Sequence, residues 1–254
     1  MTADFDCVDE AGGSGLAACS GTVQSGSAID TGTLGTKTFR VSARDHQGNL
    51  SVVVHHYTVV DRTAPAIVLL TPADGSVFQL GQGVLAFYYC TDGPGSGVAF
   101  CAGNVASGET LDTASVGGKT FTVTARDVAG NVATASVAYT VVYAFAGFAP
   151  PLATFPALGS EKAGESVPVK FSLAGDQGLA ILASGSPTWA SIPCDSTGPV
   201  VASTPAIGSL SYNRSADRYT FLWSSAKSWV GTCRQLVVTL RDGTVHRANV
   251  KFTK

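Results

Sequence analysis

Six cysteines offer the clearest chemistry in this sequence, because they occur as three pairs of near neighbours. In chain order, the pairs are Cys7 with Cys19, Cys90 with Cys101, and Cys194 with Cys233. Six cysteines can pair in many ways, but the first two pairs occupy equivalent places in two copies of one unit and must pair alike. Six free thiols in a cytosolic protein are the alternative, and the absence of any Cys-x-x-Cys argues against zinc. We therefore predict three disulfides and an oxidising compartment.

A second candidate for chemistry is an aspartate that occurs at the same turn in both copies. Asp45 and Asp127 each end the sequence Ala-Arg-Asp and precede a Gly-Asn pair. The side chain of such an Asp ordinarily accepts backbone N–H groups across the turn, while Gly48 or Gly130 adopts a positive φ. The sequence alone therefore assigns these acids a structural role first.

The repeated unit divides the chain. Lys37-Thr38-Phe39 recurs as Lys119-Thr120-Phe121, a shift of 82 residues. Internal repeats of this kind indicate tandem modules. The domains that we predict are 1–61, a truncated copy; 62–143, a complete copy; and 144–254, a different block.

The first copy lacks a counterpart of residues 62–83, since Ala3 to Cys7 aligns with Ala86 to Cys90. A sandwich without its opening strand exposes an unpaired neighbour. We expect the first 60 residues to be loosely held or completed by residues absent from this chain. No signal peptide precedes the cysteines, so the chain is expected to be the C-terminal part of a longer exported protein or the product of a truncated reading frame.

Composition favours strands. Apolar residues make up 45% of the chain and charged residues 13%, with 29 glycines and a formal charge of -2. The apolar content can build cores, while the sparse helix formers and frequent Thr, Ser and Val favour sheets joined by turns. No basic cluster suits nucleic acid, and no apolar run is long enough for a membrane helix. We predict an all-β protein without nucleic-acid binding or membrane insertion.

The complete copy is expected to hold about seven strands, as in an immunoglobulin-like sandwich. Its strands are predicted at 66–70, 83–90, 97–105, 120–126 and 132–142, with further short strands. The last block is predicted to form strands at 166–173, 210–213, 218–223, 234–241 and 245–252. Asp242-Gly243 indicates a hairpin, and we favour a three-residue loop over 242–244 that opposes Val238 to Ala248, rather than a two-residue turn that opposes Val238 to Arg247.

Two parts of the chain carry a family likeness. Residues 62–142, with Tyr-x-Cys-x-Asp ahead of Gly-Ser-Gly and Asp-x-Ala-Gly-Asn near the end, resemble bacterial immunoglobulin-like repeats of exported proteins. Residues from about 161 onward resemble the PxKF domain, on the blocks Pro168 to Phe171, Gly175 to Leu179, Gly185 to Pro187 and Trp229 to Arg234. The resemblance implies tandem immunoglobulin-like β-sandwiches, a C-terminal β-sandwich and no catalytic activity.

The same resemblance suggests calcium, because related tandem adhesins bind it at the joints between repeats. Asp61 lies at such a boundary, so Asp45 and Asp61, with Asp74 as a further candidate, are the predicted ligands. Calcium requires about six to eight oxygens, the rest coming from carbonyls and water. Asp127 has no acid in the linker that follows it, 143–149, so at most one site of this type is expected.

The functional prediction is a non-catalytic spacer or interaction module, extracellular or on a cell surface, with a protein or carbohydrate ligand. The alternative is a carbohydrate-binding region of a larger secreted hydrolase, with exposed rings among Trp189, Trp223, Trp229, Tyr212 and Tyr219. An enzyme in its own right is the third class, although no nucleophile elbow, metalloprotease helix or phosphate loop occurs. Beyond structural calcium, no cofactor is predicted.

Overall fold

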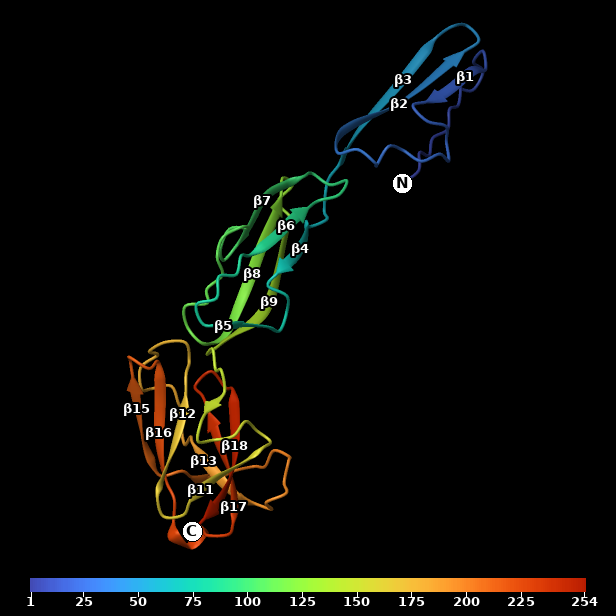
Figure 1. Ribbon diagram of the computed structural model, residues 1–254. Coiled ribbons are helices and arrows are strands. Elements are labelled where there is room, and N and C mark those ends of the chain that lie inside the picture. The colour runs from blue at the N-terminus through green and yellow to red at the C-terminus, as the bar shows by residue number, and fades with distance from the viewer. The chain divides into compact units, whose positions relative to one another are not determined.

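The computed structural model describes all 254 residues and is all-β, as predicted (Figure 1). It contains 18 strands, and its only helix is the three-residue 3₁₀ helix η1 (Lys227–Trp229). The chain divides into two compact units: residues 1–68, 88–103 and 123–135 form the first, and 69–87, 104–122 and 136–254 form the second. The domain limits expected from the repeat, after residues 61 and 143, stay a prediction.

The first copy of the repeat is a single antiparallel sheet with the order β1-β2-β3. Its strands are β1 (Leu16–Gly21), β2 (Gly35–Asp45) and β3 (Leu50–Val59). β2 and β3 form a long hairpin in which Gly35 opposes Val59 and Arg44 opposes Leu50. Ala3, 5% exposed, is the only buried residue among the first 60. The copy therefore has a sheet but almost no core.

The second copy has six strands, not about seven, in two sheets of order β4-β6 and β5-β9-β8-β7. The strands are β4 (Ala66–Thr71), β5 (Ser76–Gln79), β6 (Phe87–Thr91), β7 (Val98–Gly103), β8 (Gly117–Asp127) and β9 (Val132–Val142). The alternation in β8 directs Phe121, Val123 and Ala125 inward, and these side chains are 2%, 0% and 0% exposed. β5 was not expected: it pairs in parallel with the end of β9.

The last block contains two further sheets, of order β10-β12-β16-β15 and β11-β18-β17-β13-β14. The strands of the first are β10 (Phe148–Ala149), β12 (Ser166–Phe171), β15 (Gly208–Asn213) and β16 (Arg218–Ser224). Those of the second are β11 (Leu158–Lys162), β13 (Thr188–Ile192), β14 (Thr204–Pro205), β17 (Cys233–Thr239) and β18 (Val245–Thr253). Phe171, Tyr219, Trp223, Leu236 and Phe252 lie in one core cluster, each at most 1% exposed. This block therefore has the best-developed core of the chain.

The β17–β18 hairpin has a three-residue loop, but its register differs from both that were considered. Val238 opposes His246, and Leu236 opposes Ala248. The loop is centred on Asp242, whose Oδ1 accepts hydrogen bonds from the N–H and Oγ1 of Thr244, at 2.9 and 2.7 Å. Gly243, at φ +86°, ends the loop. The Asp242 side chain thus shifts the turn toward the N-terminus by one residue, which moves the register.

Candidate metal centre

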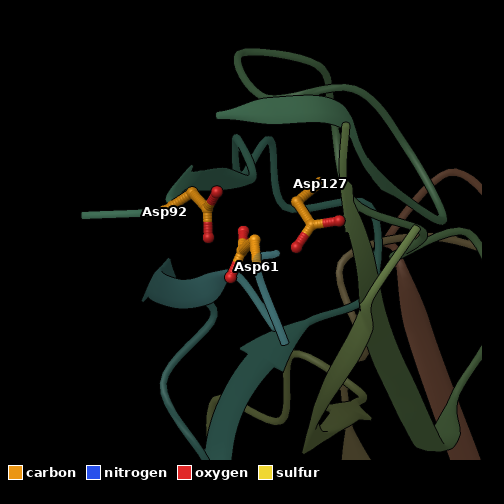
Figure 2. A group of neighbouring side chains, drawn as sticks. All are labelled: Asp61, Asp92 and Asp127. Atoms are coloured by element: carbon orange, nitrogen blue, oxygen red, sulfur yellow. The ribbon is translucent and has the colours of Figure 1, made fainter. Parts of the chain in front are cut away.

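Three aspartates that are distant in sequence lie together in the first unit. Asp61, Asp92 and Asp127 each present one carboxylate oxygen, and these three oxygens lie within 4.8 Å of one another. Figure 2 shows the three side chains gathered around one small space. Like charges at this separation repel one another, whereas hard cations such as Ca²⁺ take several carboxylate oxygens. The arrangement therefore matches the ligand chemistry of a divalent cation.

Asp127 is positioned by the turn between β8 and β9. The backbone N–H of Asn131 donates to its Oδ1 at 2.7 Å, and the Asn131 Nδ2 donates to its Oδ2 at 2.7 Å. Gly130 has φ +97°, a conformation that glycine adopts readily. Asp127 itself is 1% exposed. The turn role predicted for this Asp is therefore present, and it holds a carboxylate in a buried position.

Asp61 follows β3 and belongs to the segment that joins the two copies. Its Oδ1 accepts a hydrogen bond from the Thr63 N–H at 2.9 Å, and its Oδ2 accepts one from the Ser96 N–H at 2.8 Å. The Nδ2 of Asn131 also donates to the carbonyl oxygens of Asp61 and Thr63, both at 3.3 Å. Hydrogen bonds from Thr63 and then Ser96 lower the pKa of the Asp61 carboxyl, so it stays ionised at neutral pH.

Asp92 supplies the observation that tests whether a cation fits. Its Oδ2 accepts a hydrogen bond from the Gly97 N–H at 2.6 Å, but its Oδ1 is buried and has no hydrogen-bond partner. A buried acceptor without a partner costs about 1–3 kcal/mol. A cation held among the three carboxylates would offset the cost of burying this one, so the residues present fit a bound metal ion.

Gly95 leaves room for the carboxylate of Asp92 in its present position. A Cβ added at Gly95 would lie 2.5 Å from the Asp92 Oδ2, closer than such atoms approach in real structures. In the first copy, a Cβ at Gly13 would lie 2.7 Å from the Asp9 Oδ2. The Gly-Ser-Gly sequence of both copies thus allows the loop to close over an Asp.

The structure does not bring Asp45 and Asp61 together. Asp45 ends β2 beside the turn into β3, whereas Asp61 follows the far end of β3. The 10 residues of β3 separate them by roughly 30 Å, at about 3.3 Å per residue. The two aspartates therefore cannot share an ion. Asp74, the further candidate, accepts a hydrogen bond from the Ala138 N–H at 2.8 Å and is not one of the three clustered acids.

Asp45 has the same turn geometry as Asp127. The N–H and Nδ2 of Asn49 donate to its two oxygens at 2.8 and 2.7 Å. These hydrogen bonds, that of the Asn49 side chain first, lower the pKa of Asp45. Asp9 likewise accepts from the Gly15 N–H at 2.6 Å, as Asp92 does from Gly97. The first copy thus repeats two of the three acids of the cluster.

Sequence reasoning missed Asp92 and the partnership of Asp61 with Asp127. The signal for Asp92 was present, because an Asp follows each first cysteine by two residues, at Asp9 and Asp92. We looked for a second acidic ligand beside Asp127 in the linker that follows its repeat, residues 143–149. The structure instead places Asp61, from the linker that precedes this repeat, beside Asp127. The linker acid that lies beside a turn aspartate is therefore the one before its repeat, not the one after it.

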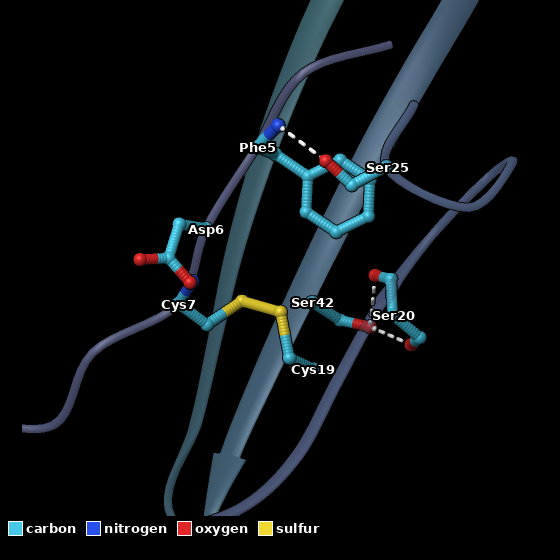
Figure 3. The surroundings of a disulfide bond; sticks show 7 residues. All are labelled: Phe5, Asp6, Cys7, Cys19, Ser20, Ser25 and Ser42. Atoms are coloured by element: carbon cyan, nitrogen blue, oxygen red, sulfur yellow. Dashed lines mark hydrogen bonds between the residues drawn. A yellow bond between two sulfur atoms is a disulfide. The ribbon is translucent and has the colours of Figure 1, made fainter. Parts of the chain in front are cut away.

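The three predicted disulfides are present. Cys7 with Cys19, Cys90 with Cys101, and Cys194 with Cys233 have Cα atoms 5.9, 6.0 and 5.2 Å apart, and no free cysteine remains. Each copy of the repeat therefore carries its own covalent clamp, which Figure 3 shows for Cys7 and Cys19 of the first copy, and the last block carries one that closes a longer loop. Disulfides of this density are typical of proteins in oxidising compartments.

The aromatic side chains of the last block pack inward or against one another. Trp223 is 0% exposed, and the Trp189 and Trp229 rings are inclined by 55° with centroids 4.8 Å apart. The Arg234 guanidinium lies over both rings, 4.9 and 4.6 Å from their centroids. The rings of Trp189 and Trp229 are therefore not coplanar, and the Arg234 guanidinium covers a face of each. The carbohydrate-binding alternative requires coplanar exposed rings, and these two do not provide them.

No family model matches the chain, and no curated protein matches it. Among solved structures, the extracellular domain of protocadherin GammaB4 aligns over 89% of this chain and 40% of its own, at 13% identity and a TM-score of 0.32. A tetra-tandem repeat in the extending region of a large adhesion protein aligns over 88% and 57%, at 17% identity and a TM-score of 0.34. The chain thus spans 40 to 57% of these chains. Scores this low give the likenesses no weight in the inferences below.

None of the helical structure in this chain could cross a bilayer, because it amounts to the single turn η1.

Proposed function

We propose that this chain is a non-catalytic module of an exported protein, in which tandem β-domains act as a spacer and interaction surface. The observation that carries the proposal is the acid cluster of Asp61, Asp92 and Asp127, with the unpartnered buried Oδ1 of Asp92. One of its members comes from the segment between two copies of a repeat. A cation bound there restricts that segment and adds to the stability of the second copy.

Calcium is the proposed ion. All three ligands are carboxylates, and the remaining positions fall to backbone carbonyls and water, as calcium prefers. Extracellular modules bind calcium with dissociation constants of about 10⁻⁴ to 10⁻³ M, and the three disulfides support an extracellular setting. A site of this strength is filled outside a cell and largely empty in the cytoplasm.

The proposed organisation keeps the limits 1–61, 62–143 and 144–254, with the last block as a PxKF-like β domain of a bacterial surface or secreted protein. Support comes from the repeated sequence, the disulfide in each part and the separate sheets of the last block. The partner of the module is a protein or carbohydrate on the outside of the cell.

Calcium titration tests the proposal. Isothermal titration calorimetry on the chelator-treated chain should detect one site of submillimolar to millimolar affinity, and amide exchange of residues 61–63 and 92–97 should slow when it fills. Asp61→Asn should weaken binding about tenfold or more, because it removes one of three charged ligands. Asp45→Asn is the matched control. Asp45 has the same turn geometry as Asp127 but lies outside the cluster of three acids.

Two outcomes would contradict the proposal. One is a chain that takes up no calcium at 10 mM or so, a concentration well above that expected for such modules. The other is binding that Asp45→Asn weakens as much as Asp61→Asn does, because the ion would then lie elsewhere. Magnesium at the same concentration serves as the control for non-specific charge effects.

A further inference from the structure

Arg234 is a buried cation that has no acidic partner. It lies on β17 and points to the same side as Leu236 and Val238, which belong to the core of the last block. The residue is 8% exposed, and none of the three ion pairs in the chain includes it. A charge that is buried without a partner costs free energy. Arg234 therefore lacks the counter-ion that such a position ordinarily requires.

The guanidinium of Arg234 uses only part of its hydrogen-bonding capacity, which amounts to five N–H donors. Its Nη1 donates to the Thr232 Oγ1 at 3.1 Å and to the Cys233 carbonyl oxygen at 3.2 Å. Its Nε is buried and has no hydrogen-bond partner. Nη2 makes no hydrogen bond either, but it is not enclosed as Nε is. The edge formed by Nε and Nη2 is therefore unsatisfied, and Nη2 is the donor on this edge that solvent reaches.

Neighbouring side chains hold the guanidinium in one place. It lies over the rings of Trp189 and Trp229, both of which are partly exposed. The Thr232 Oγ1, which accepts from Nη1, itself donates to the Trp229 carbonyl oxygen at 2.6 Å. The cation–π contacts compensate for part of the lost hydration, but they supply no carbonyl or carboxylate oxygen to the free N–H groups. Arg234 is therefore held rigidly while one edge of its guanidinium stays without an acceptor.

The electrostatic setting of Arg234 differs from that of an arginine at the surface. Burial alone lowers the pKa of Arg234, and no acidic group acts on it. Arg214, by contrast, has a side chain that is 87% exposed and pairs with Asp176 at 3.3 Å. An arginine stays protonated in either setting, but charges attract one another more strongly where the effective dielectric constant is lower. An anion that reaches the free edge of Arg234 is therefore bound more strongly than one at an exposed arginine.

We propose that Arg234 is the anion-contacting residue of a carboxylate-binding site on the last block, and that the carboxylate is an acidic side chain of a partner protein. One carboxylate oxygen accepts a hydrogen bond from Nη2, and the negative charge is the counter-ion that Arg234 lacks. An acidic polysaccharide is less favoured, because Arg234 covers one face of Trp189 and of Trp229 and the two rings are not coplanar. The site lies in residues 189–234, apart from the aspartate cluster, and does not depend on calcium.

Acetate is the probe for the carboxylate, added to the full chain after divalent cations have been removed by dialysis. The NMR resonances of the Arg234 Nε–H and of the Trp189 and Trp229 indole N–H groups should shift saturably, with half of the change at roughly 10–100 mM, as for one hydrogen bond to a charged group. Chloride at the same ionic strength should not produce these shifts. Acetate should also raise the melting temperature of the last block more than chloride does, because a ligand that binds only the folded state stabilises it.

Variants and a peptide identify the contact. Arg234→Met should weaken the response of the indole resonances to acetate about tenfold or more, because it removes the charge and the donors. Arg218→Met is the matched control, since Arg218 is exposed on the neighbouring sheet and lies outside the site. A capped tripeptide, acetyl-Ala-Glu-Ala-amide, should shift the same resonances, and its Gln counterpart should bind about tenfold more weakly or less.

Three results would overturn the proposal. The first is a response to acetate no larger than the response to chloride. This measurement needs no variant, so it decides the matter even if Arg234→Met does not fold. The second is an equal loss with Arg234→Met and Arg218→Met, because the effect would then be one of overall charge. The third is tighter binding of galacturonate than of the glutamate peptide, because the carboxylate would then come from a sugar and not from a protein.

Discussion

Replacing Phe121 by alanine should destabilise the second copy far more than replacing Phe39 destabilises the first. Phe121 is 2% exposed, and removing a buried phenylalanine ring costs about 3–5 kcal/mol of unfolding free energy. The Phe39 ring lines an open pocket on one face of the sheet β1-β2-β3. It lies 5.9 Å from the Phe5 ring and is only partly buried. Less apolar surface is lost there, so we expect about 1 kcal/mol.

Amide exchange measures the two effects separately within one molecule. A loss of about 1.4 kcal/mol corresponds to tenfold faster exchange through local opening. Phe121→Ala should therefore accelerate exchange at Val123 and Ala125 about 100-fold or more, and Phe39→Ala should accelerate exchange at Val41 and Ala43 about tenfold or less. Equal acceleration in the two copies would refute the reasoning, because it would mean that the face of β2 is covered in solution.

Three further predictions concern other parts of the chain. Replacing both cysteines of the Cys194–Cys233 disulfide, which are 39 residues apart, by serine should lower the stability of the last block by about 4 kcal/mol on the chain-entropy model, checked by calorimetry, where an unchanged melting temperature would contradict it. Burial lowers the pKa of His246, so the unfolded chain binds more protons than the folded one as the pH falls below about 6.5; stability should decrease across that range, and His246→Phe should reduce the slope of stability against pH. Gly95→Ala should weaken calcium binding, measured by calorimetry, because its methyl group would displace Asp92, whereas Gly118→Ala, with nothing within 4 Å, should leave affinity unchanged.

The repeat made the disulfides and the long β8–β9 hairpin predictable. Two copies had to satisfy one pattern, and the alternation of Phe121, Val123 and Ala125 against threonines marked an inward face that is indeed buried. Local sequence suffices when the partner strand lies across a short turn.

Pairings between distant segments could not be read in the same way. β5 beside β9 and β11 beside β18 are parallel, and parallel neighbours share no turn whose residues would indicate them. The register of β17 on β18 was wrong because β17 is buried on both faces, so its apolar pattern did not distinguish neighbouring registers. The hydrogen bonds that the Asp242 side chain accepts from Thr244 set the position of the turn, and with it the register.

Only the local part of the candidate metal site could be predicted from the sequence. Asp61 and the turn geometry of Asp45 and Asp127 follow from local sequence, but the grouping of Asp61 with Asp92 and Asp127 depends on the fold of the second copy. Asp61 lies 66 residues upstream of Asp127, and nothing in the sequence around Asp61 indicates that the two side chains lie together.

The Cys90–Cys101 bond has a consequence for handling the protein. It joins β6 of one sheet to β7 of the other across the loop that contains Gly93 and Gly95. A protease that cuts this loop leaves both fragments covalently linked, so the nicked molecule would migrate as intact on a non-reducing gel and separate only after a thiol reagent is added.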